Sequence, residues 1–425
     1  MPLLLGRRNE SIDGIGRRAS MTLYSSRATY GLRFEAQQGI IAGHYSPRIA
    51  HSSDIFYVDM TQTSDITIIG GGIIGLLTAR EFNKAGASVT LIEKNQIGQE
   101  SSWAGGGILL PLYPWHQPDP INRLVLQSLK LYPSLAAELK AETPIDPEWN
   151  PCGLLITKNP DITEADNWCR ANNLAYSLAN DALLAPFVTQ PVNPLWLPDI
   201  ANARNPRLVK SLKADLINKG VQLIEQTALK SVAINGQTIT SIETTAGKQA
   251  VNQLIIATGA WTGDVFAQFF GGQNATPPKI FPVKGQMLVF DAPPQCLPYI
   301  VLDGDQYLIP RLDGKILAGS TVEHDDYNKA TSPEVNAQLR EFAIRLFPAL
   351  KNCPIIHHWA GLRPGTDHGI PYIDRHPEIT NLSINAGHFR YGLVMGPASA
   401  QLMVDLILER TPSVSPEPYR MSAEH

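Results

Sequence analysis

One short stretch constrains the fold of this chain more than any other: residues 70–75, Gly-Gly-Gly-Ile-Ile-Gly. The β-branched run 65–69 before it predicts a buried strand, and 76–82 after it opens a helical pattern. Residues 88–92 predict a second strand, which ends at Glu93. The pattern is therefore a G-x-G-x-x-G turn inside a complete βαβ unit, with an acidic residue about 20 positions further on.

These glycines predict a binding site for the pyrophosphate of a dinucleotide. Gly70, Gly72 and Gly75 let the backbone approach the pyrophosphate closely, and the helix start directs partial positive charge toward it. The carboxylate of Glu93 is placed to accept hydrogen bonds from ribose hydroxyls. A glycine-rich turn that only joins packed elements is the alternative. The register of strand, helix, second strand and acid favours the dinucleotide site.

Composition argues against several other classes of function. A chain of 425 residues can bury a large core and predicts two domains. The formal charge of −4 gives no reason to expect nucleic acid or an anionic membrane as a partner. The four cysteines lack C-x-x-C spacing, so we expect no metal site, no disulfide framework and a cytoplasmic location. No apolar run approaches the roughly 20 residues of a membrane-spanning helix.

Residues 1–62 differ in composition from the rest of the chain. They are rich in Arg, Ser and Gly and show no periodic apolar face. We predict a disordered or artefactual extension. Two alternatives stay open: an organelle transit peptide, and translation that truly starts at Met60.

The remaining pattern predicts a discontinuous arrangement. A buried strand, 254–259, ends in a tight turn at Gly259, and a last strand, 382–386, leads through another glycine turn into a helix. We therefore expect an α/β fold, in which a Rossmann-type FAD-binding domain is interleaved with a substrate domain built on an antiparallel β-sheet. The expected segments are 63–120, 200–280 and 355–412 for the FAD-binding domain, 121–199 and 281–354 for the substrate domain, and 413–425 for a C-terminal tail.

Several stretches together carry a resemblance to a known family. They are 69–75, 256–261, 281–286, 307–311, 359–366 and 386–392. Between about 64 and 412 the chain resembles the D-amino-acid-oxidase-like FAD oxidoreductases, and within them the glycine oxidases of the thiazole branch of thiamine synthesis. The stretches 69–75 and 256–261 are general marks of FAD oxidoreductases, whereas 359–366 and 386–392 are more specific to glycine oxidases.

The resemblance implies a set of flavin contacts. Ile73 and Ile74 would flank the pyrophosphate, Glu93 and Lys94 would lie at the adenosine ribose, and the Leu229 backbone would meet the adenine. A loop would reach toward the isoalloxazine ring through Ser101, Ser102, Gly106, Gly107 and Ile108. A helix start near the N1–C2=O edge of the ring would be formed by His388, Phe389, Arg390, Tyr391, Gly392, Leu393 and Val394. Because no cysteine follows Cys353, we expect FAD to be bound non-covalently.

Three residues are candidates for the substrate site. The fork of an arginine matches a carboxylate, and the resemblance gives this role to Arg363, with a solvated loop charge as the alternative. Arg390 matches a second arginine of the substrate site, although it could serve only to cap carbonyl groups. Tyr307 matches a pocket tyrosine, although it could be an ordinary buried residue of a sheet. Val322 falls where the family has a methionine that lines the pocket.

These features predict an oxidase of glycine or of a small amino acid or secondary amine. Hydride would pass from Cα to flavin N5, O2 would be reduced to H2O2, and the imine would hydrolyse to glyoxylate and ammonia or feed thiazole assembly. The expected partners are the amino acid and O2, with thiazole synthase and a second copy of the chain as further candidates. Two rivals remain: a D-amino-acid dehydrogenase that reduces a membrane quinone, and a flavin-binding module without turnover.

Overall fold

The structure is a computed structural model that describes residues 22–26, 29–33, 63–159, 161–271, 277–324 and 327–424. The chain divides into two compact units, Met1–Asp59 and Met60–His425. In the first unit, β1 (Thr22–Ser26) and β2 (Thr29–Arg33) pair as antiparallel strands. Most of the predicted extension, residues 1–62, lies outside the described residues.

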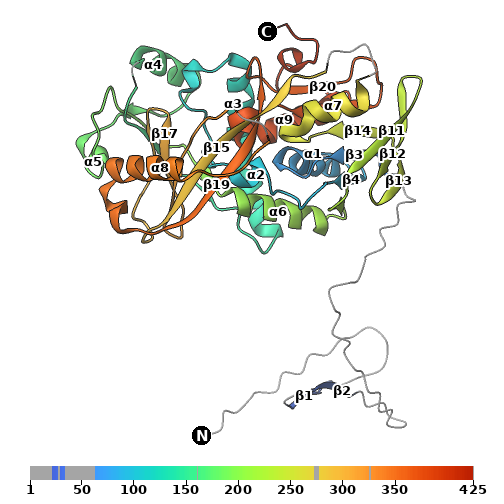
Figure 1. The fold of residues 1–425 in the computed structure, drawn as a ribbon, viewed down its shortest axis with the longest axis horizontal. Helices are drawn as coiled ribbons and strands as arrows, with labels where there is room; N and C mark the ends of the chain where they lie inside the picture. Colours follow the sequence, from blue (N-terminus) through green and yellow to red (C-terminus); the bar gives the residue numbers. More distant parts are fainter. Residues whose placement is uncertain are drawn as a thin grey trace. The chain divides into compact units, whose positions relative to one another are not determined.

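The second unit is organised around a six-stranded sheet (Figure 1). Its strand order is β10-β4-β3-β14-β21-β20, with five parallel strands and an antiparallel edge strand, β20. The strands are β3 (Ile66–Ile69), β4 (Val89–Ile92), β10 (Gln222–Ile224), β14 (Gln253–Ile256), β20 (Tyr372–Arg375) and β21 (Leu382–Ala386). This confirms the predicted α/β fold with a Rossmann-type sheet.

Both faces of this sheet are covered, so successive side chains along each strand point alternately into two different cores. Ile68 and Leu91 point into a core shared with a layer of helices, whereas Ile69 and Ile92 point into a core on the other face. The helices of the first layer are α1 (Ile73–Lys84), α3 (Asp119–Glu142), α6 (Asn205–Asn218) and α9 (Gly392–Ile407). The other face is covered by β11 (Leu229–Asn235), β12 (Thr238–Thr244), β13 (Gly247–Ala250) and α7 (Thr262–Phe270).

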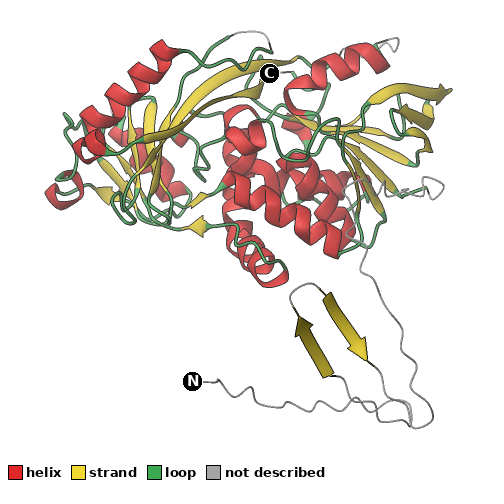
Figure 2. Cartoon of the chain, turned by 60° about the horizontal axis from the view of Figure 1, so that its bottom comes forward, coloured by secondary structure: helices red, strands yellow, loops and turns green. Residues whose placement is uncertain are grey.

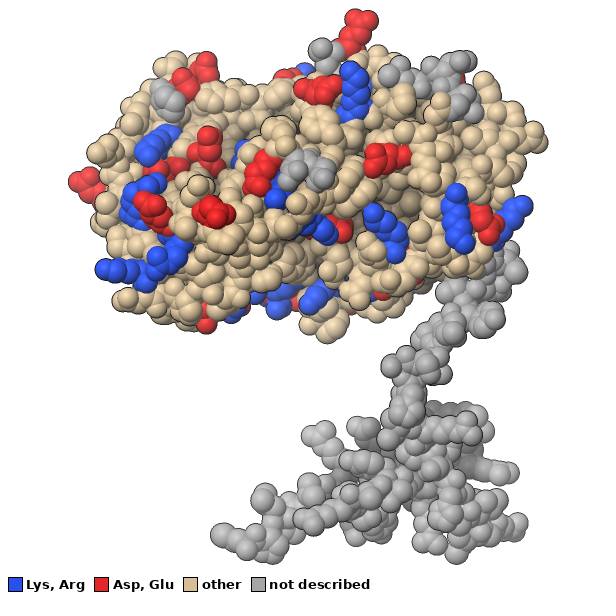
Figure 3. Space-filling model, viewed as in Figure 1, with Lys and Arg blue, Asp and Glu red and all other residues tan. Residues whose placement is uncertain are grey.

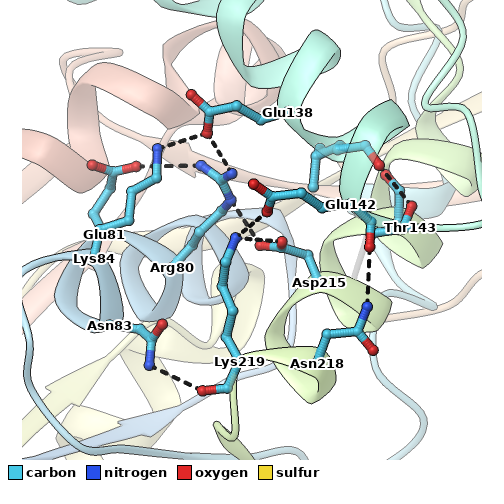
Figure 4. Close-up of polar contacts among 12 residues, drawn as sticks. Arg80, Glu81, Asn83, Lys84, Glu138, Glu142, Thr143, Asp215, Asn218 and Lys219 are labelled. Atoms are coloured by element: carbon cyan, nitrogen blue, oxygen red, sulfur yellow. Dashed lines mark hydrogen bonds and ion pairs between the residues drawn. The ribbon is translucent and has the colours of Figure 1, made fainter. Parts of the chain in front are cut away.

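A buried cluster of charged side chains ties three helices of the layer together (Figure 4). Arg80 of α1 is 1% exposed and donates to Asp215 of α6 (2.9 Å) and Glu138 of α3 (2.7 Å). Lys219 reaches Asp215 and Glu142, each at 2.5 Å. Every buried charge of this cluster therefore has an opposite charge beside it, as a stable buried ion pair requires.

The other large sheet of the second unit has eight strands and is separate from the six-stranded sheet. It lies in the left part of Figure 2. Its order is β19-β15-β18-β17-β16-β6-β8-β7. The strands are β6 (Leu154–Ile156), β7 (Ser177–Leu178), β8 (Leu195–Leu197), β15 (Ile280–Asp291), β16 (Ile300–Asp303), β17 (Gln306–Pro310), β18 (Lys315–Gly319) and β19 (Ile355–Thr366). Helix α8 (Pro333–Leu346) packs its apolar face on this sheet through Leu339 and Phe342. Besides several short 3-10 helices, the remaining helices and strands of the described residues are α2 (Ser101–Ala104), α4 (Ile162–Ala171), α5 (Asp181–Leu184), β5 (Trp149–Asn150) and β9 (Asn202–Ala203).

Three details differ from the arrangement expected from sequence. The sheet is mixed, because β6 pairs parallel with β16. Strand β19, in a segment expected to join the FAD-binding domain, pairs along its length with β15 in the eight-stranded sheet. Helix α3, expected with the substrate domain, packs against α9. Partners so distant along the chain leave no local signal in the pattern of apolar residues.

No helix in the described part of the chain combines the length and the apolar character needed to cross a bilayer. On the face of the molecule shown in Figure 3, acidic and basic side chains are interspersed rather than gathered by sign.

Candidate active site

A cavity of about 440 Å³ lies between the six-stranded and the eight-stranded sheet of the second unit. It is lined by the turn after β3, the residues after β4 and β14, and the segment that links β21 to α9. It also reaches Tyr307 of β17 and Arg363 of β19. One side of the cavity is therefore at the carboxyl ends of the parallel strands, where nucleotides bind in folds of this kind. The other side is a surface of the eight-stranded sheet.

The glycine turn at one side of the cavity is packed too tightly for side chains. Gly70 has a φ of +116°, and a Cβ there would lie 2.4 Å from the carbonyl oxygen of Ala257. A Cβ on Gly75 would lie 2.0 Å from the carbonyl oxygen of Gly70, so this glycine lets helix α1 approach the strand. Gly72, Ile73 and neighbouring Ile74 line the cavity. The turn thus presents bare backbone at the start of α1.

Two residues after β4 lie on the same side of the cavity. The carboxylate of Glu93 accepts hydrogen bonds from the N–H groups of Gly71 (2.7 Å) and Asn95 (2.9 Å), which fixes its position. The ammonium group of Lys94 lies 4.1 Å from the centre of the Trp261 ring, a cation–π contact. Leu229, at the start of β11, lines the same region.

The predicted flavin loop begins with the single turn of α2 and continues as extended chain. The Ser102 hydroxyl accepts a hydrogen bond from the N–H of Ile73 (2.8 Å), which links this loop to the glycine turn. Ser101, Gly106, Gly107 and neighbouring Ile108 line the cavity. A Cβ on Gly106 would lie 2.7 Å from the Ile309 side chain, so the loop rests directly against the eight-stranded sheet.

The segment between β21 and α9 closes another wall of the cavity. His388 through Leu393 line it, and Phe389 has a φ of +48°. Burial lowers the pKa of His388 to about 3, and its Nε2 lies 3.0 Å from the Ser399 hydroxyl. This histidine is therefore neutral at physiological pH and serves as a fixed hydrogen-bonding group.

Arg363 is a largely enclosed cation that faces the cavity from β19 and keeps an intermediate exposure there. Its guanidinium donates to the carbonyl oxygens of Lys284 (3.2 Å) and Thr321 (3.1 Å) and to the Ser320 hydroxyl (2.9 Å). Burial lowers the pKa of Arg363, and the positive charge of Arg390 adds to this shift. Tyr307 and the more distant carboxylate of Glu323 oppose it. Among the described residues, no carboxylate lies within ion-pair distance of this guanidinium.

The room for this side chain comes from a glycine on the neighbouring strand. Gly285 of β15 lies opposite Gly361 of β19, and a Cβ on Gly285 would lie 2.2 Å from the Arg363 guanidinium. The guanidinium therefore lies against bare backbone. Any larger residue at position 285 would displace it.

The structure brings together most of the residues predicted from sequence. Tyr307, Arg363 and Arg390 all line the one cavity, as does Gly259 at the end of β14. Two predicted residues do not line it. They are Gly75, which packs against the strand, and Val394, which is 1% exposed in the core of the helix layer. Val322 also lies outside the lining and is 46% exposed.

Sequence reasoning missed several polar groups of the lining. Asn205 and Asn385 line the cavity, and the buried side-chain oxygen of each has no hydrogen-bond partner among the described residues. Trp261 lies in the family motif 256–261, but nothing in the sequence marks its side chain as the partner of Lys94. A single asparagine at a helix start or a strand end gives no signal that distinguishes a ligand contact from a cap.

These features fit an elongated dinucleotide. The turn at Gly72 presents backbone where a Cβ would crowd Ser102, with 3.1 Å between Cβ and Oγ. Asn205 and Asn385 add polar side chains to the lining, each with a buried oxygen that has no hydrogen-bond partner among the described residues. Glu93 lines the cavity on the side of this turn, and Arg363 lines it on the side of the eight-stranded sheet.

Comparison with known proteins defines the class. The family model described as FAD dependent oxidoreductase matches residues 65–406. A glycine oxidase of Pseudomonas aeruginosa is 39% identical over 364 residues, covering 83% of this chain and 97% of that protein. A bifunctional protein ThiO/ThiG of Synechocystis is 31% identical over 371 residues, 84% of this chain and 53% of that protein. The crystal structure of glycine oxidase from Geobacillus kaustophilus superimposes with a TM-score of 0.79 at 26% identity, covering 86% of this chain and all of that one.

The chain belongs to the family of FAD-dependent oxidoreductases that includes D-amino-acid oxidase. It is an FAD-dependent amine oxidoreductase. The resemblance drawn from its sequence is thereby confirmed. These comparisons favour neither a quinone-linked D-amino-acid dehydrogenase nor a flavin module without turnover.

Proposed function

We propose that this enzyme oxidises glycine, or an amino acid or secondary amine of similar size, with O2 as the acceptor. The observation that carries the proposal is the buried Arg363 guanidinium, which faces the cavity and has only neutral hydrogen-bond acceptors among the described residues. A buried cation of this kind gains most from a carboxylate ligand, because the anion removes an uncompensated charge. The similarity to glycine oxidases over most of the chain supports the same substrate.

The residues of this chain would bind and orient the substrate. Arg363 would hold the carboxylate through two parallel hydrogen bonds, with Tyr307 beside it and Arg390 on the opposite wall. Burial of these groups would exclude water and strengthen the contacts. Glycine has no side chain, so its carboxylate is the main group by which the protein can hold it. Binding of that carboxylate would therefore fix where Cα lies.

FAD would be held by the turn at Gly72, by Glu93, by the loop at Gly106 and by the segment from His388 to Leu393. When bound, it supplies the acceptor for the hydride of the substrate Cα and passes the electrons to O2, which yields H2O2. The protein need not supply a strong base if the amino group is neutral when it reacts. The imine leaves the site and hydrolyses to glyoxylate and ammonia.

The arrangement of domains and partners forms part of the same proposal. The six-stranded sheet would belong to the FAD-binding domain and the eight-stranded sheet to the substrate domain. The chain spans about half the length of the bifunctional ThiO/ThiG relative. That relative suggests thiazole synthase as a partner that consumes the imine in the cytoplasm. A homo-oligomer would be revealed by size-exclusion chromatography with light scattering.

A coupled assay tests the substrate. The purified yellow protein should produce H2O2 with glycine, and the rates with sarcosine, D-alanine and D-proline rank the pocket's preference. Acid denaturation should release all flavin into the supernatant, as expected of non-covalent FAD. Turnover of D-alanine with a quinone but not with O2 would reject the oxidase and favour the dehydrogenase.

A further inference from the structure

Arg311 is a second arginine without an ion-paired carboxylate among the described residues, and it contacts the flavin loop rather than the substrate site. It follows β17 and is 4% exposed. Its Nη1 donates to the Asn202 side chain (2.7 Å) and the Ala203 carbonyl (3.1 Å), and its Nη2 donates to the Gly106 carbonyl (2.7 Å). One guanidinium therefore joins β9 and the flavin loop to the end of β17.

The charge of Arg311 is balanced only by neutral oxygen atoms at hydrogen-bond distance. The nearby acids Glu148 and Asp313 each lie 3.0 Å from Arg204 instead. Among the described residues, no carboxylate forms an ion pair with Arg311. Burial lowers the pKa of Arg311 to about 10, so the group stays charged at neutral pH. Burial of a charge that has only neutral partners costs stability. Arg311 is such a charge, and it contacts the flavin loop at a single carbonyl group, that of Gly106.

The Arg311 contact fixes the direction of the next backbone N–H. In a planar trans peptide, the C=O of one residue and the N–H of the next point to opposite sides. Because the Gly106 carbonyl points at Arg311, the N–H of Gly107 points away from it. The Gly107 carbonyl accepts from the N–H of Ala203 (2.9 Å), so the N–H of Ile108 points away from β9 in the same manner.

Both of these N–H groups are free to bind a ligand. Within the described part of the chain, neither Gly107 nor Ile108 has an acceptor for its N–H, and both residues line the cavity. A Cβ on Gly107 would lie 2.0 Å from the Ala203 carbonyl oxygen, so the loop is pressed against β9 and cannot turn. The neighbouring carbonyl groups of Gly106 and Gly107 are therefore held, while the two donors have no acceptor among the described residues.

We propose that Arg311 is a positioning residue for the flavin: by holding the Gly106 carbonyl, it aims the N–H groups of Gly107 and Ile108 at the isoalloxazine ring. The ring's oxygen and nitrogen atoms are acceptors, and donors directed at them favour the reduced, more electron-rich ring. Arg311 thereby raises both the affinity for FAD and its reduction potential. The inference depends on FAD binding alone and not on which amine is oxidised.

The surroundings of Arg311 offer a direct test by chemical rescue. Arg311 and Gly105 line a second, smaller cavity of about 140 Å³, together with Trp103 and Trp359. A small guanidine can enter through this cavity into the space that truncation of Arg311 would leave. Arg204 lines the same cavity but does not bond the loop, so it provides a matched control.

The experiment measures FAD affinity and reduction potential in Arg311→Met, Arg311→Lys, Arg311→Ala and Arg204→Met. Affinity is measured by fluorescence titration of the apoprotein, and potential by equilibration with a reference dye. In Arg311→Met we expect FAD to bind about ten- to a hundredfold more weakly and the potential to fall. Arg311→Lys should be intermediate, because it keeps the charge but loses the fork. Arg204→Met should match the wild type, and ethylguanidinium should restore affinity to Arg311→Ala.

The outcomes separate positioning from packing. Wild-type affinity and potential in Arg311→Met would overturn the proposal. Equal losses in Arg204→Met would also overturn it, because they would reflect a general effect of charge. If Arg311→Met fails to fold, Arg311→Lys decides: wild-type values in both measurements reject the proposal. Binding of acetate at Arg363 should persist in the flavin-loaded Arg311→Lys protein, which keeps this test independent of the substrate assignment.

Discussion

Two arginines that the fold encloses in different regions, Arg80 and Arg363, have opposite kinds of partners. Arg80, in the helix layer, is held by the carboxylates of Asp215 and Glu138. Arg363, in the cavity, is held by two carbonyl oxygens, the Ser320 hydroxyl and Tyr307. The first charge is paired with carboxylates inside the fold, whereas the second one forms no ion pair among the described residues. Under the proposed function, an enclosed charge marks the substrate site where the fold supplies no ion-paired carboxylate.

The largest effect is expected from breaking the neutralised cluster. Asp215→Ala would leave Arg80 without its Asp215 bond and Lys219 with only Glu142 (Figure 4). Loss of one partner from a buried ion pair typically costs about 3–5 kcal/mol of stability. Thermal unfolding of the FAD-loaded protein at one scan rate should show this loss. The control is Glu417→Ala, which removes an exposed pair with Arg420 and should cost no more than about 1 kcal/mol. Equal effects of the two substitutions would remove the distinction between the regions.

The opposite result is expected at Arg363. Arg363→Ala should leave FAD bound and the fold intact, since no counter-charge among the described residues would be stranded. Turnover of glycine should fall by about 2–5 kcal/mol of transition-state stabilisation, roughly 30- to several-thousand-fold. Steady-state H2O2 production measures this, and both KM and kcat should change. Arg363→Lys should rescue only in part.

Two controls sharpen the assignment of Arg363. Arg375→Ala removes an arginine that is 46% exposed on β20 and should leave turnover unchanged. An amine without a carboxylate should be oxidised equally by the wild type and Arg363→Ala. Near-normal oxidation of glycine by Arg363→Ala would mean that the carboxylate is held elsewhere.

The contrast between the two arginines also shows what the sequence can predict. The glycine turn at 70–75 and the strand at 382–386 are local, so their patterns predicted β3, α1 and β21 closely. Arg363 was found through a motif shared with a family. The partners of Arg80 lie 58 and 135 residues away in the sequence, and the residues next to Arg80 do not indicate which distant residues these are.

The same limit applies within the site. Arg311 contacts Gly106 across 205 residues, and β19 joins β15 rather than the six-stranded sheet. Such contacts depend on how the two sheets enclose the cavity. Periodicity and propensity report which face of an element is apolar, but not which distant element covers it.

A third prediction concerns ligand binding to the uncompensated charge. Acetate carries a carboxylate but no amine, so it should occupy the place of the substrate carboxylate beside Arg363. At ten times its dissociation constant, a ligand stabilises the folded state by about 1.4 kcal/mol. The melting temperature of the FAD-loaded wild type should rise accordingly, and that of Arg363→Ala should not. An equal rise in both proteins would place acetate at another site.

The smallest effect is expected from acid, and it should fall on the helix layer. Partial burial acts to raise the pKa of Glu138, but hydrogen bonds from Lys84 and Arg80 outweigh it and lower the pKa to about 2. A carboxyl group whose pKa is lower in the folded state contributes stability that is complete above its unfolded pKa, near 4.5. That contribution is lost as the pH falls from there toward 2. The Glu138 side chain is 38% exposed, so water screens the contribution and keeps it small.

Urea unfolding at a series of pH values between 7 and 3 measures this loss, and Glu138→Gln provides the comparison. The glutamine keeps a hydrogen-bond acceptor for Arg80 but has no charge to titrate, so its stability should fall less steeply below pH 4.5. The apoprotein is the better sample, because protonation near the bound flavin is then absent from the measurement. If Glu138→Gln follows the wild-type curve, the acid sensitivity arises outside the cluster, from other carboxylates such as Asp303, which also has a lowered pKa. The cluster would then contribute stability without setting its pH dependence.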